Sequence, residues 1–339
     1  MRKKTLKDVR ENNTAEILKW ILKNERISRI ELSESCELSP STVSQAVSSL
    51  LEEGIIEEFS EGESTGGRKP VMLRISPQYG SVITTEITRT GVDAKIYNLL
   101  NQPLASIPIA SRMVTGNALM NVICNFIDFV KAGKEGVPAR VIGLGLLVQD
   151  DIPAYYLTTE FSTSLAADVI QLETAISIRC NIPVKKELIN RYSLDYYLKR
   201  DEAKCSSYAY VDIGERLTAS FLINNIPVKN PNGTVFDLSS IKSKHNTDTD
   251  KNTTFRNLSV DDMVDKLTRL IESALLFFPV ENIFIGGQFE ELDNVVGKLS
   301  EEFSFSPVIR KAHFEQKNIT SVFARQILID NYRSLLGGI

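Results

Sequence analysis

The apolar residues of the N-terminal segment recur at helical spacing. In residues 14–23 they form a single stripe on one face of a helix, made of Ile17, Leu18, Ile21 and Leu22. Further on, Ser28 and Glu31 have the spacing of a capping box, in which each side chain satisfies a free backbone N–H at the start of a helix. The pattern predicts one helix ending near Lys23 and a short second helix beginning after Ser28.

A third helix is bounded by its own start and stop residues. Ser39 suits the N-cap, Pro40 fits the first helical position because its missing N–H costs nothing there, and Gly54 suits the left-handed residue that ends a helix. One face is apolar and is expected to meet the core: Val43, Val47, Leu50 and Leu51. The opposite face is short and uncharged: Ser41, Thr42, Ser44, Gln45 and Ser48.

That polar face has two interpretations. Hydroxyl and amide side chains at the start of a helix can donate and accept hydrogen bonds, which is what reading base edges in a major groove requires. The alternative is the solvated face of an ordinary three-helix bundle, which would more often carry Glu and Lys. The uncharged face therefore favours a DNA-reading helix.

The segment after the third helix predicts a β-hairpin. "GIIEEFS" is typical of a strand, "EGESTGG" of a turn-forming loop, and "VMLRI" of a second strand with one inward face: Val71, Leu73 and Ile75. Three helices and a hairpin follow each other in this order in a winged helix-turn-helix. The wing tip would then hold Gly66, Gly67, Arg68 and Lys69 before Pro70, with glycine allowing close approach and arginine suited to a narrow minor groove. A plain turn with a stray basic pair is the alternative.

Net charge limits how such a domain can bind DNA. The chain has 39 Lys and Arg against 43 Asp and Glu, a formal charge of −4, and residues 1–75 hold 12 and 13. The positive residues gather before the first helix and at the wing: Arg2, Lys3, Lys4, Lys7, Arg10, Arg68, Lys69 and Arg74. We expect local phosphate contacts, modest non-specific affinity and specificity that depends on the helix and the wing.

Other bulk properties indicate the compartment and the number of domains. A length of 339 residues favours two or three domains. The four cysteines (Cys36, Cys124, Cys180 and Cys205) form no CxxC pair, which is typical of buried single thiols in a reducing compartment. The sequence has neither the apolar run of a secretory signal nor a segment of about 18 apolar residues. A soluble, cytoplasmic protein with no membrane partner is expected.

Beyond Pro77 the pattern changes to strands interleaved with helices. Strands are predicted in "GSVITTEI", "GVDAKIYNLL", "PLASIPIA" and "RVIGLGLLV", with a helix over 117–133. A second set begins near Tyr208 with "SYAYVDIG" and "RLTASFLINN", followed by a helix over 259–278 and the strand "NIFIGG". Two similar halves predict a duplicated α/β fold. A last helix over 321–336 has an apolar face: Val322, Ile327, Leu328, Tyr332 and Leu335.

Almost the whole chain resembles a repressor of the ROK family, in which a winged helix-turn-helix precedes a two-lobed body related to sugar kinases of the actin-like ATPase fold. The segment "ISRIELSESCELSPSTVSQAVSSLLEEGIIEE" with "STGGRKPVMLRI" is similar to the family's DNA-binding signature. The body motifs "VIGLGLLV", "NIPVKKELIN", "YVDIGERLTASFLINN" and "NIFIGG" are similar in order and spacing. In "NIFIGG" the resemblance matches Gly286 and Gly287 to glycines near the adenosine pocket, although a tight turn alone would need them.

Departures from the family pattern argue against catalysis. Where family kinases have Asp followed by glycines, this chain has the run Glu86–Thr90, in which Thr88 and Arg89 would block close approach to phosphate. In the Glu-Asn-Asp motif of the general base, Glu187 is retained, but Leu188 and Ile189 take the other places, and isoleucine cannot accept a proton. We expect no cofactor, no catalytic residue and no sugar phosphorylation.

The family's zinc motif is also absent. The segment Asn230–Asn257 contains no cysteine and a single histidine, His245, so no metal is expected. The family's Glu-x-Gly-His sugar contact aligns with Asp237-Leu238-Ser239-Ser240, in which only an acid remains. Glu187 and Asp237 are therefore the candidate effector-binding residues that the resemblance implies.

The resemblance implies a winged helix-turn-helix in residues 1–76, a first α/β lobe in 77–190 with the helix of 320–339 packed back on it, and a second lobe in 191–319 for dimerisation and effector sensing. The expected function is that of a repressor of carbohydrate-related genes, binding a palindromic, AT-rich DNA operator as a homodimer or higher oligomer and sensing a sugar or sugar phosphate. Two alternatives stay open: an active ROK-type sugar kinase with a DNA-binding domain, and a regulator that answers to a protein partner.

Overall fold

The chain divides into two compact units. A computed structural model describes residues 6–337 apart from 25, 60–70, 134, 151, 163–166, 201–204, 215, 229–234, 240–254, 256–257, 288, 305 and 313–318. One unit comprises Met1–Leu146, Thr159–Lys186 and Thr320–Ile339, and the other comprises Leu147–Thr158 and Glu187–Ile319. No helix within the described ranges is long and apolar enough to cross a membrane.

The N-terminal part of the first unit has the elements of a winged helix-turn-helix. They follow in the order α1 (Leu6–Lys23), β1 (Ile27–Ser28), α2 (Arg29–Cys36), α3 (Pro40–Glu52), β2 (Ile56–Phe59) and β3 (Met72–Ile75). The three helices and the hairpin strands confirm the sequence prediction. The early start of α1 and the strand β1 were not predicted, because neither segment has an apolar stripe. The strand β1 completes a three-stranded sheet in the order β1-β3-β2.

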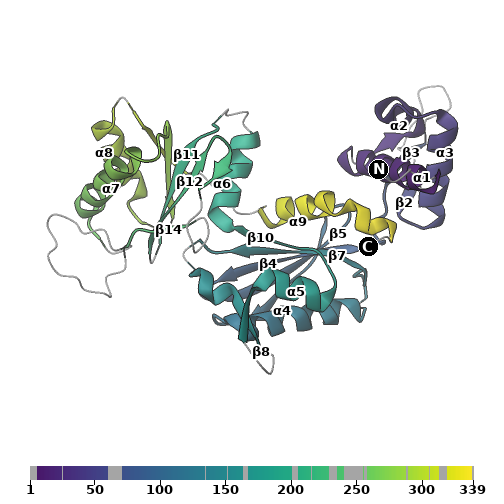
Figure 1. Cartoon of the computed structure of the whole chain (residues 1–339), viewed down its shortest axis with the longest axis horizontal. Coiled ribbons are helices and arrows are strands. Elements are labelled where there is room, and N and C mark those ends of the chain that lie inside the picture. The colour runs from purple at the N-terminus through teal and green to yellow at the C-terminus, as the bar shows by residue number, and fades with distance from the viewer. Residues whose placement is uncertain are drawn as a thin grey trace. The chain divides into compact units, whose positions relative to one another are not determined.

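The rest of the first unit is a sheet covered on both faces (Figure 1). Its strand order is β10-β7-β4-β5-β6. The strands are β4 (Ser81–Thr88), β5 (Gly91–Asn98), β6 (Pro103–Ala110), β7 (Val141–Val148) and β10 (Val184–Leu188). On one face lie α4 (Gly116–Lys131) and α5 (Leu172–Cys180), and on the other lies α9 (Ile319–Asp330). The strands predicted for β4 to β7 and the helix α4 are confirmed.

The C-terminal segment differs from the single helix predicted over 321–336. The α-helix α9 ends at Asp330, and a 3-10 helix, η4 (Tyr332–Leu336), follows. At the break, the side-chain nitrogen Nδ2 of Asn331 donates to the Ile327 carbonyl at 2.8 Å, and the Asn331 backbone N–H donates to the same carbonyl at 3.0 Å. Of the predicted apolar face, Ile327, Leu328 and Leu335 are buried, whereas Val322 and Tyr332 are half-buried.

The second unit is a second sheet between helices. Its strand order is β13-β12-β11-β15-β16, with β14 beside β12. The strands are β11 (Tyr208–Ile213), β12 (Leu217–Ile223), β13 (Ile226–Pro227), β14 (Phe236–Asp237), β15 (Asn282–Gly287) and β16 (Val308–Lys311). One face packs against α7 (Val260–Leu275) and α8 (Leu292–Glu302), and the other against α6 (Ile189–Arg200).

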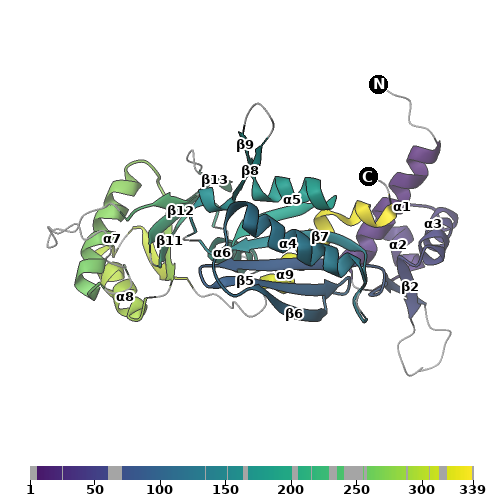
Figure 2. The same ribbon diagram turned by 90° about the horizontal axis from the view of Figure 1, so that it is seen from below.

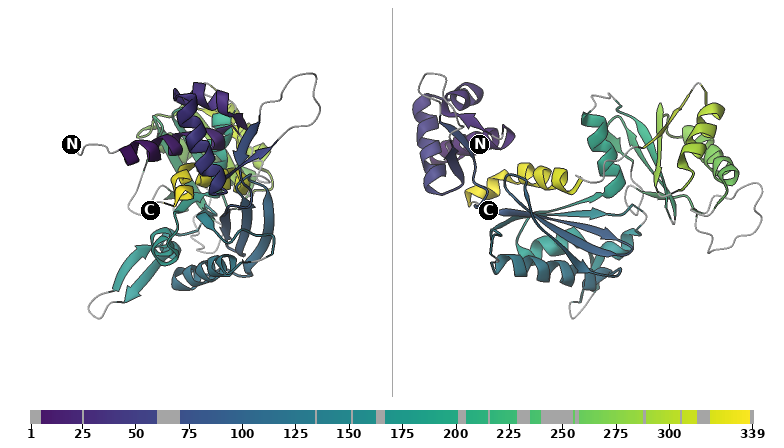
Figure 3. Two further views of the ribbon diagram at one scale, coloured as in Figure 1. Left: turned by 90° about the vertical axis from the view of Figure 1, so that its right-hand side faces the viewer. Right: turned by 180° about the vertical axis from the view of Figure 1, so that it is seen from behind.

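A two-stranded ribbon projects from the molecule. It consists of β8 (Thr158–Ser162) and β9 (Ala167–Gln171), which pair only with each other in the described structure. The 3-10 helix η1 (Ala154–Leu157) precedes it. Figures 2 and 3 show the ribbon extending away from the first-unit sheet, close to the start of α5.

The four cysteines are free thiols. Cys124 and Cys180 are buried, and the other two are half-buried. Burial and a hydrogen bond with Cys180 raise the pKa of Cys124 to about 12, so this thiol is protonated at neutral pH. The sequence predicted buried single thiols. Burial is confirmed for Cys124 and Cys180, but these two thiols are neighbours rather than single.

Candidate nucleic-acid interface

The start of α2 is fixed by the predicted capping box. The Ser28 backbone N–H donates to Glu31 Oε2 at 2.7 Å, and the Glu31 N–H donates to Ser28 Oγ at 3.3 Å. The hydrogen bonds from the Ser28 backbone and side chain hold the pKa of Glu31 below its ordinary value. At the other end, Glu37 adopts a left-handed φ of 54° and turns the chain toward α3. The helix-turn-helix geometry is thus set by local hydrogen bonds.

The inward face of α3 forms part of the domain core. Val43, Val47 and Leu50 are fully buried, as predicted. Leu51 is only half-buried, so its assignment to the core is wrong. The fourth buried position is Ala46. The helix packs against α1, whose predicted stripe is also buried: Ile17, Leu18, Ile21 and Leu22. This core holds the outward face of α3 in a fixed orientation.

The outward face of α3 contains the predicted DNA-reading residues. Ser41, Ser44, Gln45 and Ser48 are exposed, and Thr42 is half-buried. At the N-cap, Ser39 Oγ lies 2.9 Å from Ser41 Oγ and 2.8 Å from Thr42 Oγ1, and it accepts from the Thr42 N–H at 3.2 Å. The helix therefore presents hydroxyl and amide groups along one exposed side, with the first two hydroxyls also bonded to the cap.

The wing is described only at its base. β2 and β3 are antiparallel, with Ile56 opposite Ile75 and Phe59 opposite Met72. Leu73 and Ile75 are buried, whereas Val71 is 46% exposed, so placing Val71 on the inward face is wrong. The predicted tip, with Gly66, Gly67, Arg68, Lys69 and Pro70, lies outside the described residues.

Two arginines of the domain are neutralised by glutamates. Arg74 donates from Nε to Glu57 Oε1 at 2.7 Å, its Nη2 lies 2.6 Å from the same oxygen, and its guanidinium lies 4.9 Å from the ring centre of Phe59. Arg29 Nη2 lies 2.8 Å from Glu58 Oε1. Because Glu57 offsets its charge, Arg74 would attract a DNA phosphate less strongly than the sequence analysis expected. Arg10 is exposed, and residues 2–4 lie outside the described ranges.

The two candidate effector residues both belong to the second unit. Glu187 is half-buried in β10. Asp237 lies in β14, where Arg216 Nη1 donates to its Oδ2 at 2.5 Å and the Ser239 N–H donates to its Oδ1 at 3.0 Å. Partial burial opposes ionisation, but the Ser239 hydrogen bonds and the Arg216 charge still hold the pKa of Asp237 below its ordinary value. A ligand at Asp237 would have to share this carboxylate with Arg216.

A buried polar network lies beside Ile189, at the junction of β10 and α6. Asn190 follows Ile189 and begins α6; its N–H donates to Asp150 Oδ2 at 2.8 Å, and its side-chain amide donates to Asp212 Oδ1 at 2.6 Å. The Tyr210 hydroxyl donates to the same Asp212 oxygen at 2.7 Å, and burial with nearby carboxylates raises the pKa of Tyr210. Sequence reasoning missed this network, because three segments far apart in the chain supply it.

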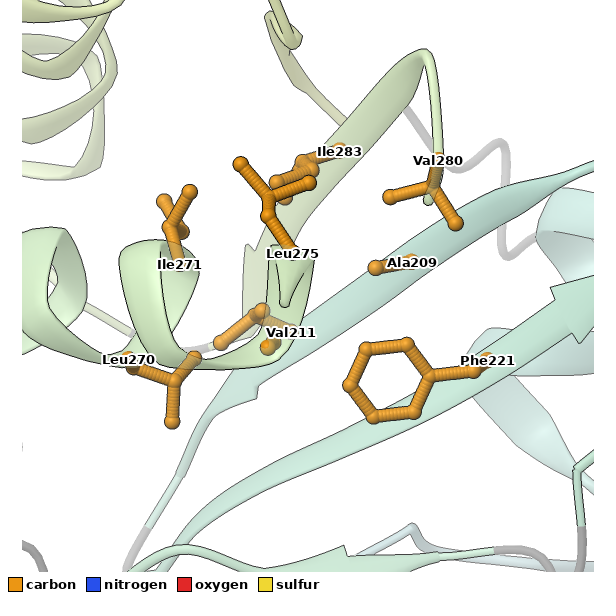
Figure 4. Close-up of a pocket in the computed structure, with 9 residues that line it drawn as sticks. Ala209, Val211, Phe221, Leu270, Ile271, Leu275, Val280 and Ile283 are labelled. Atoms are coloured by element: carbon orange, nitrogen blue, oxygen red, sulfur yellow. The ribbon is translucent and has the colours of Figure 1, made fainter. Parts of the chain in front are cut away.

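An apolar pocket lies inside the second unit (Figure 4). Its lining comes from β11, β12, α7, β15 and the segment before β15: Ala209, Val211, Phe221, Leu270, Ile271, Ala274, Leu275, Val280 and Ile283. These side chains offer no hydrogen-bond partner to a sugar hydroxyl, which would be costly to bury there. Among the residues that the structure describes, no cluster of His, Cys, Asp and Glu could hold a metal ion.

Comparison with known proteins agrees with this architecture. Residues 10–57 match the family model described as winged helix-turn-helix DNA-binding. A xylose repressor of Bacillus subtilis (strain 168) is 30% identical over 228 residues, which are 64% of this chain and 56% of that protein. The DNA-binding transcriptional dual regulator NagC of Escherichia coli (strain K12) is 27% identical over 154 residues, 44% of this chain and 38% of that protein.

The fold of the whole chain also has a match. The crystal structure of a ROK family transcriptional regulator, a homolog of the E. coli MLC protein, superposes with a TM-score of 0.60 at 14% identity, over 97% of this chain and 100% of that one. The chain spans about half the length of the xylose repressors it matches, 53% and 56% for two of them. It is a winged helix-turn-helix protein with a body of the ROK fold, homologous to the xylose repressors and to NagC.

Proposed function

We propose that this chain is a cytoplasmic, sequence-specific DNA-binding repressor of carbohydrate-related genes. The observation that carries the proposal is the exposed, uncharged polar face of α3 on a domain that matches a DNA-binding family model. Homology to proteins named as xylose repressors and as NagC supports both the regulatory role and the link to carbohydrates.

The proposed DNA contacts divide between the major and the minor groove. Ser41, Thr42, Ser44, Gln45 and Ser48 would meet base edges and phosphates in the major groove, with Gln45 as the longest side chain able to pair with an adenine. The wing residues Gly67, Arg68 and Lys69 would enter the adjacent minor groove, which favours AT-rich flanks. Because Arg74 and Arg29 are paired with glutamates, phosphate contacts are few and binding has a moderate salt dependence.

The operator is proposed to be palindromic. A single α3 reads only a few base pairs, so a homodimer or higher oligomer with two-fold symmetry would place two copies in successive major grooves. In this proposal residues 1–76 bind DNA, residues 77–190 with 320–339 form the first lobe, and residues 191–319 serve dimerisation and sensing.

The body is proposed to sense a sugar or sugar phosphate without phosphorylating it. Ile189 has no proton acceptor at the position that matches the family's general base, and its neighbour Asn190 is bonded to Asp150 and Asp212. Glu187 and Asp237 are the proposed effector contacts. A ligand there would change operator affinity only by binding one arrangement of the protein better than another.

Selection of duplexes from a random-sequence pool by the full chain tests the function. We expect enrichment of a two-fold symmetric motif, bound at least about a thousandfold more tightly than random duplex at physiological salt. A pool that stays random after repeated rounds, while the protein remains folded, would contradict the proposal.

A further inference from the structure

The last turn of α1 receives a hydrogen bond from the C-terminal segment. Arg325, near the middle of α9, donates from Nη2 to the Leu22 carbonyl at 2.9 Å. The last carbonyls of a helix lack partners within the helix and attract cations, so a guanidinium is well suited to this place. Leu22 is buried and α1 packs against α3, so a shift at the end of α1 would disturb the contact between the two helices.

The same helix is held tightly on the body. Phe323 and Ile327 of α9 are fully buried. A Cβ added at Gly145 of β7 would lie 2.5 Å from Ile327 Cδ1 and 2.6 Å from Phe323 Cε1. At its beginning, Thr320 Oγ1 lies 2.7 Å from the Tyr97 hydroxyl. The helix therefore has little freedom to shift on the strand beneath it.

The end of the segment holds the connection between the winged helix-turn-helix and the body. Tyr79, which follows the last wing strand β3, donates from its hydroxyl to the Leu335 carbonyl at 2.9 Å. Arg140 donates to the Tyr79 hydroxyl and, from Nη2, to the Ser334 carbonyl at 2.8 Å. The 3-10 helix η4 also lies against α1. Residues 319–336 thus contact the body, the connection and α1.

We propose that the segment 319–336, α9 with η4, couples the body to the winged helix-turn-helix, and that the Arg325–Leu22 hydrogen bond is the contact through which DNA binding and body state influence each other. The inference rests on the proposed function. The boundary between the two units falls between Ile319 and Thr320, at the first residue of the segment, so the segment leads from that boundary to the contacts with α1. Coupling through such an element is reciprocal: DNA bound at α3 must also alter α9.

Hydrogen exchange on the full chain, with and without a duplex selected from the random pool, tests this reciprocity. The variants are Arg325→Ala, Arg325→Lys and the matched control Gln326→Ala, whose side-chain amide donates to Asp330 of the same helix at 2.6 Å. In the wild type the duplex should change exchange of the α9 amides by about threefold or more, on the scale of one hydrogen bond. Gln326→Ala should respond equally, Arg325→Ala should lose the response, and Arg325→Lys should retain part of it.

Two results would overturn the coupling role: α9 amides of the wild type that ignore the duplex, or an Arg325→Ala chain that responds like the wild type. If Arg325→Ala fails to fold, Arg325→Lys takes its place. A response of Arg325→Lys that is smaller than that of the wild type and of Gln326→Ala supports the coupling role, and an equal response contradicts it. Failure to select any duplex is a different outcome and counts against the proposed function itself.

Discussion

The carboxylate of Glu31 makes the cap of α2 sensitive to pH. Its folded pKa lies below the unfolded value because Ser28 hydrogen-bonds the ionised form, so its stabilisation is present above the unfolded pKa and is lost as pH falls through the folded pKa. Glu31→Gln keeps an acceptor but cannot titrate. We expect the wild type to be the more stable at neutral pH and the difference to shrink in acid, as the pH falls below the ordinary Glu pKa of about 4.3.

Urea unfolding followed by fluorescence measures this effect locally, because the single tryptophan, Trp20, lies in α1 of the same domain. If the free energy of unfolding differed between wild type and Glu31→Gln by the same amount at neutral and at acidic pH, the capping box would not depend on the charge of Glu31.

Residues whose surroundings come from near neighbours in sequence could be predicted. The caps at Ser28 and Ser39 and the buried stripe of α1 follow from spacing alone, and the structure confirms them. Leu51 lies at the margin of its apolar stripe and Val71 lies just before the paired strand, so pattern alone placed both too deep. The Asp150–Asn190–Asp212 network could not be predicted, because its members meet only through the tertiary fold.

At the scale of elements, the end of α9 shows how a local polar group overrides an apolar pattern. The stripe continues through Leu335, which predicted one helix, but Asn331 bonds back to Ile327 with its side chain and the α-helix stops. Period and length predicted the strands β4 to β7, β11, β12 and β15 and the helices α4 and α7, whereas α5, α6, α8 and β16 were not predicted. The helix-on-strand contact at β7 was not predictable either, since nothing in the sequence links Gly145 to a helix nearly two hundred residues away.

The close approach of α9 to β7 leads to a stability prediction. Gly145→Ala should destabilise the protein by about 1–3 kcal/mol, because the new methyl group meets the fully buried Phe323 and Ile327. The control is Gly297→Ala in α8, where an added Cβ meets nothing within 4 Å and helix propensity should add about 1 kcal/mol of stability. Thermal unfolding compares the two. Equal effects of both substitutions would mean that α9 does not pack on β7 as described.

For the whole molecule, we expect no sugar-kinase activity from the body. A coupled assay with ATP, Mg²⁺ and a panel of hexoses should give no turnover above the protein-free rate, because Ile189 cannot accept the proton of a sugar hydroxyl. Turnover that follows this protein through gel filtration would contradict that expectation and favour an active kinase with a DNA-binding domain.

The central claim is that α3 reads DNA sequence, and a mobility-shift titration with Gln45→Ala tests it most directly. The duplexes are the selected operator and its single-base-pair variants, and the control is Gln78→Ala, another exposed glutamine, which lies outside α3. We predict that Gln45→Ala loses about 1–3 kcal/mol of discrimination at one base pair per half-site, whereas Gln78→Ala matches the wild type. Unchanged discrimination at every position in Gln45→Ala would contradict the assignment of α3 as the DNA-reading helix.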